Sequence, residues 1–201
     1  MSNYEYIIAS LPYLTQDYKY DQGQGFQAVV EEIRGNLNEK DQAAMDFLLR
    51  GFDPAQLDAG FYQEALRQSC RFLREYFRFD LNLRNAKVRF LNRELGRSEE
   101  QDVVGWEEQE EAEFEEARKV DDALSQRDLL SREQALDDVV WEKADSLGTF
   151  HYFDLTAVLS YLTKLHIVDR WLALDQEKGR ELFIQLVNEV RGTFKGVKYQ
   201  A

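Results

Sequence analysis

The stretch FRFDLNLRNAKVRFLNRELG, residues 77–96, carries apolar side chains on two opposite faces of the helix that its spacing predicts. The first face is interrupted by Arg84 and comprises Phe77, Leu81, Val88, Leu91 and Leu95. The second face comprises Phe79, Leu83, Ala86 and Phe90. One polar edge between the faces comprises Arg78, Asn85, Arg89 and Asn92. Helices with this pattern usually lie between two packing layers, so we expect a central helix that is packed on two sides.

The composition of the whole chain favours further helices around this one. Only two prolines and eleven glycines interrupt 201 residues, which favours long helices over many short strands. Hydrophobic residues make up 44% and charged residues 31%, which is typical of a folded protein with a heavily solvated surface. We therefore predict an all-α fold: an elongated bundle of long antiparallel helices that forms a single helical domain over residues 1–201.

Caps and breakers place the ends of the predicted helices. The opening YEYIIASLPYL fits a helix or a strand, and a helix is favoured because nothing nearby offers a strand partner. A mobile loop is expected over 12–25, and an acidic helical segment near 99–125. The other helices are expected over 26–35, 38–51, 58–96, 131–148, 155–174 and 176–191. The predicted N-caps are Asn38, Asp53, Ser98, Ser131, Asp154 and Asp175.

The charge of the chain limits its partners. The balance of 25 basic and 38 acidic residues gives a net charge of -13, which repels the phosphate backbone of a nucleic acid and the anionic heads of lipids. A single cysteine, Cys70, fits a reducing compartment. No basic-then-apolar leader opens the chain, and no apolar run approaches the roughly 20 residues of a membrane span. We expect a cytoplasmic protein that does not insert into the membrane.

Motifs for catalysis, cofactors and metals are not evident in the sequence. It has no phosphate-binding GxxxxGK loop and no HExxH, and no Glu stands three residues before either histidine. His166 and Asp169 form a candidate proton-handling pair, although a core histidine is the more usual explanation of this pattern. Three arginines near Cys70 could lower the pKa of its thiol, but an incidental cysteine is more usual. We therefore predict no catalytic, cofactor-binding or metal-binding residues.

Three segments resemble a known family. They are the opening YEYIIASLPYL, the central FDLNLRNAKVRFLNRELG and the later DLTAVLSYLTKLHIVDRW. Together they resemble a bacterial family of uncharacterised proteins associated with V/A-type ATPases. That family is similar to the ATPase subunit called C in archaea and bacteria and d in eukaryotes. The similar features are Tyr4 and Tyr6 at the start, and Asp80 shortly before Asn85 with basic residues following, as at Arg89.

The resemblance implies a non-catalytic, all-helical socket that joins the rotating shaft of a V/A-type ATPase to its membrane ring. Its protein partners would be the shaft and ring subunits, at the cytoplasmic face of the membrane. The chain departs from the typical subunit in being shorter, and the acidic residues 107–116 have no counterpart there. The sequence thus leaves open a general helical adaptor or assembly factor and, if His166, Asp169 or Cys70 lines a polar pocket, an enzyme.

Two groups of residues are candidates for contact with a partner. One group is basic and would meet acidic groups on that partner: Arg84, Arg89 and Arg93. The other group is aromatic and lies in the early loop, where such side chains serve well as interface anchors: Tyr13, Tyr18 and Tyr20. The competing interpretation of the basic group is that Arg84 pairs with Asp80 on its own helix and that the other two arginines are solvated.

Overall fold

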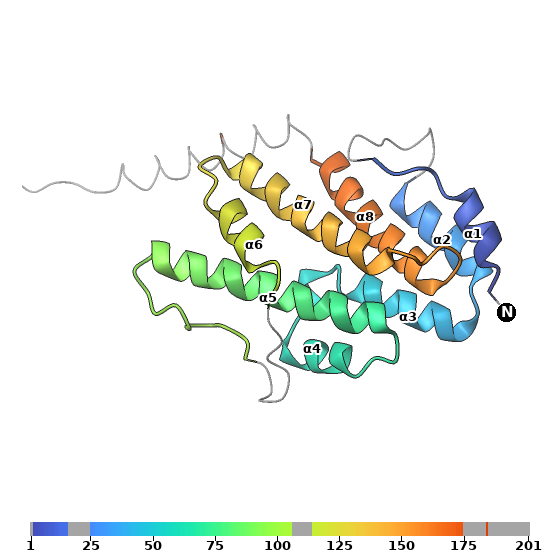
Figure 1. The fold of residues 1–201 in the computed structure, drawn as a ribbon, viewed down its shortest axis with the longest axis horizontal. Helices are drawn as coiled ribbons and strands as arrows, with labels where there is room; N and C mark the ends of the chain where they lie inside the picture. Colours follow the sequence, from blue (N-terminus) through green and yellow to red (C-terminus); the bar gives the residue numbers. More distant parts are fainter. Residues whose placement is uncertain (1, 16–24, 106–113, 175–183, 185–201) are drawn as a thin grey trace, which may run out of the picture.

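The structure is a computed structural model that describes residues 2–15, 25–105, 114–174 and Ile184. Within these ranges the chain forms eight α-helices and one 3-10 helix, and it forms no strand (Figure 1). The predicted all-α class is therefore confirmed. No helix in the described ranges is long and apolar enough to cross a bilayer. The predicted helix at 176–191, apart from Ile184, and its cap Asp175 lie outside the described residues.

The N-terminal part of the chain forms α1 (Tyr4–Ser10), α2 (Phe26–Asn36), α3 (Glu39–Arg50) and the 3-10 helix η1 (Pro54–Gln56). The opening segment is thus a helix rather than a strand. Asn38 caps α3 as predicted, because its side chain accepts a hydrogen bond from the amide of Asp41. The carboxylate of Asp41 in turn accepts hydrogen bonds of 2.6 Å from Ser2 and Tyr4, which fixes α1 to the start of α3.

The prediction of one continuous helix over 58–96 is wrong. The segment forms two helices, α4 (Ala59–Leu66) and α5 (Arg71–Glu94). No glycine or proline marks the break at 67–70. Tertiary packing causes it: α4 folds back against α5 and buries Phe61 and Tyr62. The guanidinium of Arg74 then stabilises the turn by donating hydrogen bonds to the carbonyls of Gln68 and Ser69, at 2.5 and 3.0 Å.

The second half of the described chain forms α6 (Ala117–Leu124), α7 (Leu129–Gly148) and α8 (Leu155–Leu172). Asp154 caps α8 as predicted. The cap of α7 is Asp128 rather than the predicted Ser131, and it accepts hydrogen bonds from the Ser131 amide and hydroxyl at 2.8 and 2.9 Å. Helices α7 and α8 pack side by side as a hairpin, and Gly148 allows their close approach, since a Cβ there would lie 2.9 Å from the Ser160 hydroxyl.

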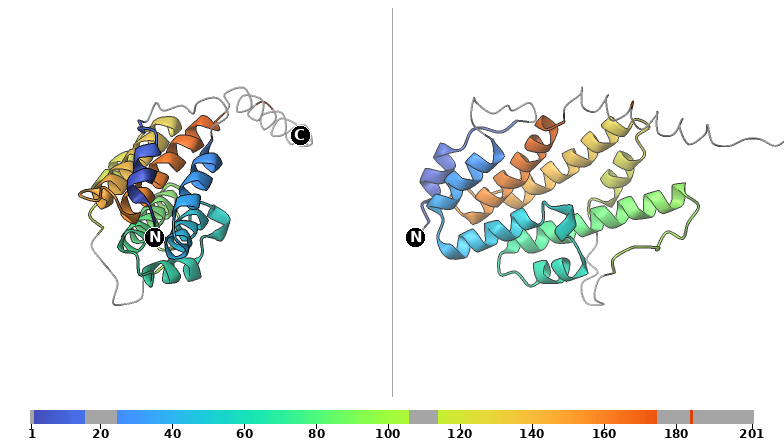
Figure 2. Two further views of the ribbon diagram at one scale, coloured as in Figure 1. Left: turned by 90° about the vertical axis from the view of Figure 1, so that its right-hand side faces the viewer. Right: turned by 180° about the vertical axis from the view of Figure 1, so that it is seen from behind.

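Two separate hydrophobic clusters explain the two apolar faces of α5. Phe77 and Leu81 belong to a large cluster that also draws on α1 to α4 and α8. Phe79 and Leu83 belong to a smaller cluster formed with α6 and α7. Figure 2 shows α5 running between α4 on one side and the α7–α8 hairpin on the other. Packing on two sides is therefore correct for the first half of the stretch 77–96.

The second half of that stretch is packed differently from the prediction. Leu91 and Leu95, assigned to an apolar face, are 56% and 59% exposed, whereas Asn85 and Asn92, assigned to a polar edge, are buried. The reason is that residues 98–104 are not helical but run back along α5, and the two amides bond to their backbone. The acidic helical segment predicted near 99–125 is thus wrong for its first part, Ser98 caps no helix, and residues 106–113 lie outside the described ranges.

Candidate partner-binding site

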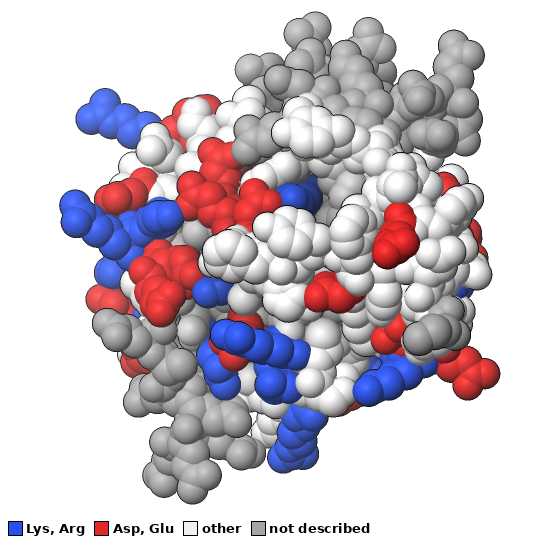
Figure 3. Space-filling model, turned by 45° about the vertical axis from the view of Figure 1, so that its right-hand side comes forward, with Lys and Arg blue, Asp and Glu red and all other residues white. Residues whose placement is uncertain are grey.

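A groove of about 660 Å³ lies at the end of the bundle where α1 meets the turn between α7 and α8. Its lining comprises Ile8, Leu11, Pro12, Tyr13, Leu14, Asp145, Gly148, His151, Tyr152, Ala157, Ser160, Tyr161 and Lys164. Figure 3 turns this end of the molecule toward the viewer, and uncharged side chains cover much of the centre of that face. The groove is thus lined by residues from the start of the chain and by residues almost 150 positions later. The hydroxyl of Tyr161 donates a hydrogen bond to the carbonyl of Pro12, which is 149 positions earlier in the sequence.

Local interactions hold the two walls of this groove in place. On one wall, Asn3 caps α1, and Pro12 follows the helix, which cannot continue through it. The carbonyl of Pro12 accepts a hydrogen bond of 3.1 Å from the Tyr161 hydroxyl on α8, so the segment after α1 is tied to the opposite wall. On that wall, the Ser160 hydroxyl donates to the Ala144 carbonyl at 2.8 Å and holds α8 against α7.

The turn between α7 and α8 presents three aromatic side chains to solvent. Phe150, Tyr152 and Phe153 are 85%, 68% and 59% exposed. Phe150 has a φ of 67°, a left-handed conformation that is costly for a residue with a Cβ and that glycine usually occupies after a helix. His151 and Asp154 bracket the turn through a 2.5 Å contact between Nδ1 and the carboxylate. The turn thus combines backbone strain with exposed aromatic surface, a combination that is common at functional sites.

The polar groups Lys164, Asp145 and His151 that line the groove each have a partner within the chain. The ammonium of Lys164 donates to the carboxylate of Asp145 at 2.7 Å and lies 5.6 Å from the centre of the Trp141 ring. His151 contacts Asp154, as described above. What remains for a ligand is therefore mainly apolar and aromatic surface, which favours another protein's apolar side chains over a charged small molecule.

One predicted aromatic contact residue lies in this groove, and two lie outside the described part of the chain. Tyr13 lines the groove and is 88% exposed, the exposure expected of an interface anchor before its partner binds. Tyr18 and Tyr20 fall within 16–24 and are not described. The prediction missed the aromatic side chains of the α7–α8 turn. The signal was present in TFHYFD, residues 149–154, where three aromatic residues stand between two helices although no helical stripe requires them.

The three predicted arginines each pair with an acid of the same chain. Arg84 donates to Asp80 at 2.8 Å, the pairing offered as the competing interpretation. The carboxylate of Asp80 also accepts a 2.7 Å hydrogen bond from Tyr62, whose pKa is raised by burial and by that neighbouring charge. Asp80 therefore links α4 to α5 through Tyr62, and Arg84 on the same helix pairs with the Asp80 carboxylate.

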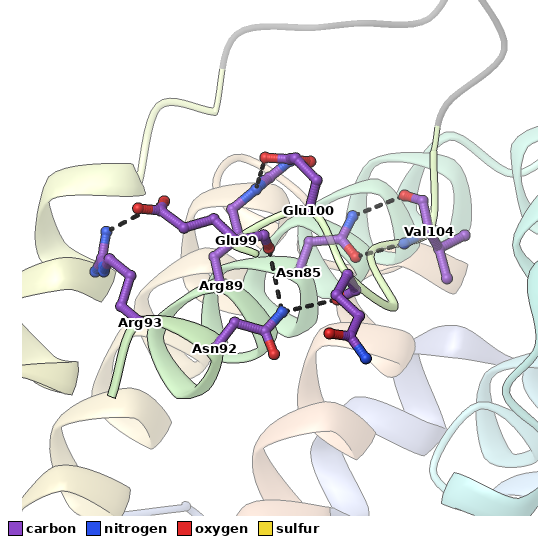
Figure 4. A network of polar contacts seen from close by, with 8 residues as sticks. Asn85, Arg89, Asn92, Arg93, Glu99, Glu100 and Val104 are labelled. Carbon is purple, nitrogen blue, oxygen red and sulfur yellow. Dashed lines mark hydrogen bonds and ion pairs between the residues drawn. The ribbon is translucent and has the colours of Figure 1, made fainter. Parts of the chain in front are cut away.

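Arg89 and Arg93 help to fix the segment that follows α5 (Figure 4). Arg89 makes two hydrogen bonds of 3.0 Å to Glu100, and Arg93 lies 3.8 Å from Glu99. Arg93 also reaches Asp121 on α6 at 3.5 Å. Neither guanidinium is simply solvated, so contact with a partner would have to compete with these intramolecular ion pairs.

The buried asparagines make the stronger part of the network in Figure 4. Asn85 donates to the Val104 carbonyl at 2.9 Å and accepts from the Val104 amide at 3.1 Å. Asn92 donates to the carbonyls of Glu99 and Gln101 at 3.2 and 2.8 Å. These two side chains thus make hydrogen bonds with backbone groups of residues 98–104 that in a helix would bond to other backbone groups.

A second cleft, of about 240 Å³, lies between η1, α5, α7 and α8 and contains His166. The charged groups that line it with His166 are Asp80, Arg84, Lys87, Asp137 and Arg170. Burial is the main cause that lowers the pKa of His166 to about 4, and Arg170 adds to it, so the imidazole is neutral at pH 7. The ring stacks on Phe52 with a centroid distance of 4.1 Å.

The arrangement in this cleft resembles internal packing more than catalytic chemistry. Asp80 pairs with Arg84, and Asp137 accepts hydrogen bonds from Arg170 and from the Trp171 indole. The aliphatic hydroxyl in the lining, that of Thr163, donates to the Leu159 carbonyl at 2.9 Å. Cys70 is not among the lining residues. Within the described ranges, no group of three or more His, Cys, Asp and Glu side chains is arranged to hold a metal ion.

A comparison with protein families finds one match, over residues 54–193, to the family described as "Protein of unknown function (DUF2764)". The matched part begins at η1 and runs through α8, so it includes the α7–α8 wall of the groove and leaves α1 to α3 outside. No curated protein and no solved structure matches the chain.

Proposed function

The chain belongs to the DUF2764 family, and we propose that it is a non-catalytic subunit of a V/A-type rotary ATPase. In this proposal it acts in the central stalk as the socket that couples the rotor shaft to the membrane ring. It would work in the cytoplasm, held at the membrane face by its protein partners. The choice of this complex rests on the resemblance of the three segments that include residues 79–96 and 154–171.

The observation that supports binding to a protein is the aromatic groove at the end of the bundle. Tyr13 and Tyr152 line it from elements far apart in the sequence, and both are more than two-thirds exposed. Exposed apolar surface of this kind often marks a site of interaction with another protein, and Tyr is one of the residues that dominate the binding energy at protein interfaces. A socket needs such a surface on a rigid body, and here the groove lies on packed helices.

The first experiment is a pull-down of the tagged protein from gently solubilised native membranes, followed by mass spectrometry. We expect V/A-type ATPase shaft and ring subunits in fixed proportion. Replacing both Tyr13 and Tyr152 with Ala should reduce their recovery at least tenfold, because two aromatic anchors are lost. The matched control replaces Leu129 and Leu130, which are 69% and 55% exposed at the other end of α7, and should leave recovery unchanged.

A general helical adaptor or assembly factor is the alternative outcome of the same experiment. It would recover other proteins through the groove while the intact ATPase remained elsewhere in the extract. That result would show that the ATPase is not the partner, while the groove would still be a binding surface for another protein. If the variant at Tyr13 and Tyr152 recovered as much of the partner as the control variant, the groove would not be the surface that binds the partner.

A further inference from the structure

A third cleft, of about 370 Å³, lies between α7 and α8, toward the end of this hairpin that is opposite its turn (Figure 1). Ile167 and Val168, which line it from α8, are buried. Trp141 of α7 and Trp171 of α8 also line it, so two of the chain's three tryptophans meet in one cleft. A cleft of this volume accommodates a small molecule or one long side chain, and its tryptophan rings favour a flat or cationic group.

The polar part of this lining is acidic. Asp137 and Asp138 contribute two carboxyl groups, and Gln134 contributes an amide. Among the residues that the structure describes, the lining includes no lysine and no arginine. Lys164 and Arg170, whose charges lie near the two tryptophan rings, line other surfaces, namely the aromatic groove and the cleft around His166. The cleft therefore presents negative charge and aromatic rings to a cation that enters it.

Arg170 of the chain itself indicates which cation these side chains favour. Its guanidinium donates a hydrogen bond to the Asp137 carboxylate and lies 5.9 Å from the centre of the Trp171 ring. The Trp171 indole donates to the same carboxylate at 2.7 Å. The Asp137 side chain is only 14% exposed, and burial raises the pKa of its carboxyl group although Arg170 and Trp171 act to lower it. The charge of Asp137 is thus incompletely compensated, and a further cation would stabilise it.

The spacing of the lining residues suits a planar group. The hydrogen bond to Asp137 holds Trp171 level with that residue, and Trp141 lies one helical turn further along α7, about 6 Å along the helix axis. We propose that the cleft binds a guanidinium group carried on an alkyl chain. A guanidinium suits it better than an ammonium, because a planar and weakly hydrated cation stacks on tryptophan and pairs with a carboxylate at the same time.

Such a group has two sources, a free small molecule or the arginine side chain of another protein, and both present the same chemistry to the cleft. The proposal is independent of the ATPase role, because this cleft and the aromatic groove share none of their described lining residues. A binding measurement on the cleft and the pull-down through the groove therefore succeed or fail separately.

Tryptophan fluorescence of the full-length protein measures this binding. In a Trp106→Phe background the emission comes from Trp141 and Trp171, both of which line the cleft. Butylguanidinium represents the free small molecule, and a short peptide with one arginine between glycines represents the side chain of a protein. Each is compared with its ammonium counterpart, butylammonium or the same peptide with lysine. We expect a saturable change in emission, with about tenfold tighter binding of the guanidinium probe than of its counterpart.

The two probes distinguish the sources, and two matched variants locate the site. Saturation by the arginine peptide alone would identify a protein as the source, whereas saturation by butylguanidinium would identify a free small molecule. Asp138→Asn removes a charge from the lining and should weaken binding about threefold. Glu142→Gln removes the same charge from α7, but Glu142 bonds to Lys119 of α6, so binding should not change. No saturation by either guanidinium probe, equal binding of the ammonium counterparts, or equal binding by the two variants would overturn the proposal.

Discussion

Phe150 combines an exposed aromatic ring with a backbone conformation that suits glycine, since its φ is 67° and its side chain is 85% exposed. We predict that Phe150→Gly raises the free energy of unfolding by roughly 1 kcal/mol, because the strain of the left-handed conformation is relieved. The same change should reduce recovery of the partner. Urea denaturation and the pull-down measure the two effects.

The neighbouring substitution Tyr152→Gly is the control, because the φ of Tyr152 is not in the left-handed region. It should lower stability slightly through the greater backbone freedom of glycine in the unfolded chain. If the Phe150→Gly variant were no more stable than the parent protein, the left-handed conformation of Phe150 would not be costing the fold any stability.

His166 makes stability depend on pH. Its pKa in the folded protein is about 4, against an ordinary value of 6.5, because burial and Arg170 disfavour the charged form. Between pH 6.5 and pH 4 the unfolded chain binds a proton that the folded protein does not, so this residue lowers the free energy of unfolding as pH falls. The loss approaches about 3 kcal/mol near pH 4.

His166→Phe should remove this contribution while keeping a ring against Phe52. We predict that the difference in stability between pH 7 and pH 5, measured by urea denaturation, is smaller in the variant by more than 1 kcal/mol. An equal pH dependence in both proteins would show that the imidazole titrates normally, and would reopen the pairing of His166 with Asp169 as a proton-handling site.

Local hydrogen-bonding chemistry decided which residue-level predictions succeeded. Asn38 and Asp154 were recognisable as caps because each stands directly before an apolar periodicity. Ser131 follows the same rule, but α7 begins two residues before it at Leu129, so Asp128 takes the cap position and accepts a hydrogen bond from the Ser131 amide. Ser98 fails for a different reason, because the backbone after it bonds to the distant side chains of Asn85 and Asn92.

At the level of elements, a buried amide should hold the segment 98–104 to α5 more strongly than an exposed ion pair does. Asn85 satisfies both backbone groups of Val104, so Asn85→Ala leaves a donor and an acceptor without partners and should cost about 1–3 kcal/mol. Arg89→Ala removes an ion pair whose side chains are 41% and 69% exposed and should cost about 1 kcal/mol or less.

Hydrogen exchange at the Val104 amide distinguishes these effects from general destabilisation. We expect strong acceleration in Asn85→Ala and little change in Arg89→Ala. The reverse order would mean that the ion pair, and not the asparagine, positions the segment.

The sequence predicted the position and type of most described helices but missed the break between α4 and α5. Periodicity continues through residues 67–70, and no glycine or proline interrupts it. The break exists because α4 buries Phe61 and Tyr62 against α5, which is a gain that only the folded molecule provides. The exposure of Leu91 and Leu95 has the same kind of cause, since the segment 98–104 covers a different side of the helix.

At the scale of the whole molecule, α5 joins two hydrophobic clusters and should make them unfold together. Phe77 belongs to the larger cluster and Phe79 to the smaller one, and both are at least 97% buried. Phe77→Ala and Phe79→Ala should each cost about 3–5 kcal/mol and shift one common transition. Leu91→Ala, at an exposed position, should have little effect.

Thermal unfolding followed by circular dichroism and by calorimetry tests this coupling. Two resolved transitions, one sensitive to each phenylalanine, would contradict a single domain built around α5.

The candidate site was only partly predictable because it is assembled from both ends of the described chain. Tyr13 was identified from its position in a loop, and it does line the groove. Tyr152 lines the same groove but comes from the turn between α7 and α8, more than 130 residues later, and sequence periodicity does not relate the two positions. The three arginines predicted to contact a partner lie on α5, and each has an acidic partner within the chain.

Site-specific photo-cross-linking in cells tests most directly whether the aromatic groove binds the V/A-type ATPase. A photoreactive phenylalanine derivative is placed at position 152 in the aromatic groove or, as the control, at position 129 at the other end of α7. We predict that a shaft or ring subunit of the V/A-type ATPase becomes attached at position 152 and not at position 129. Attachment of no ATPase subunit at 152, in cells that assemble the intact enzyme, would contradict it.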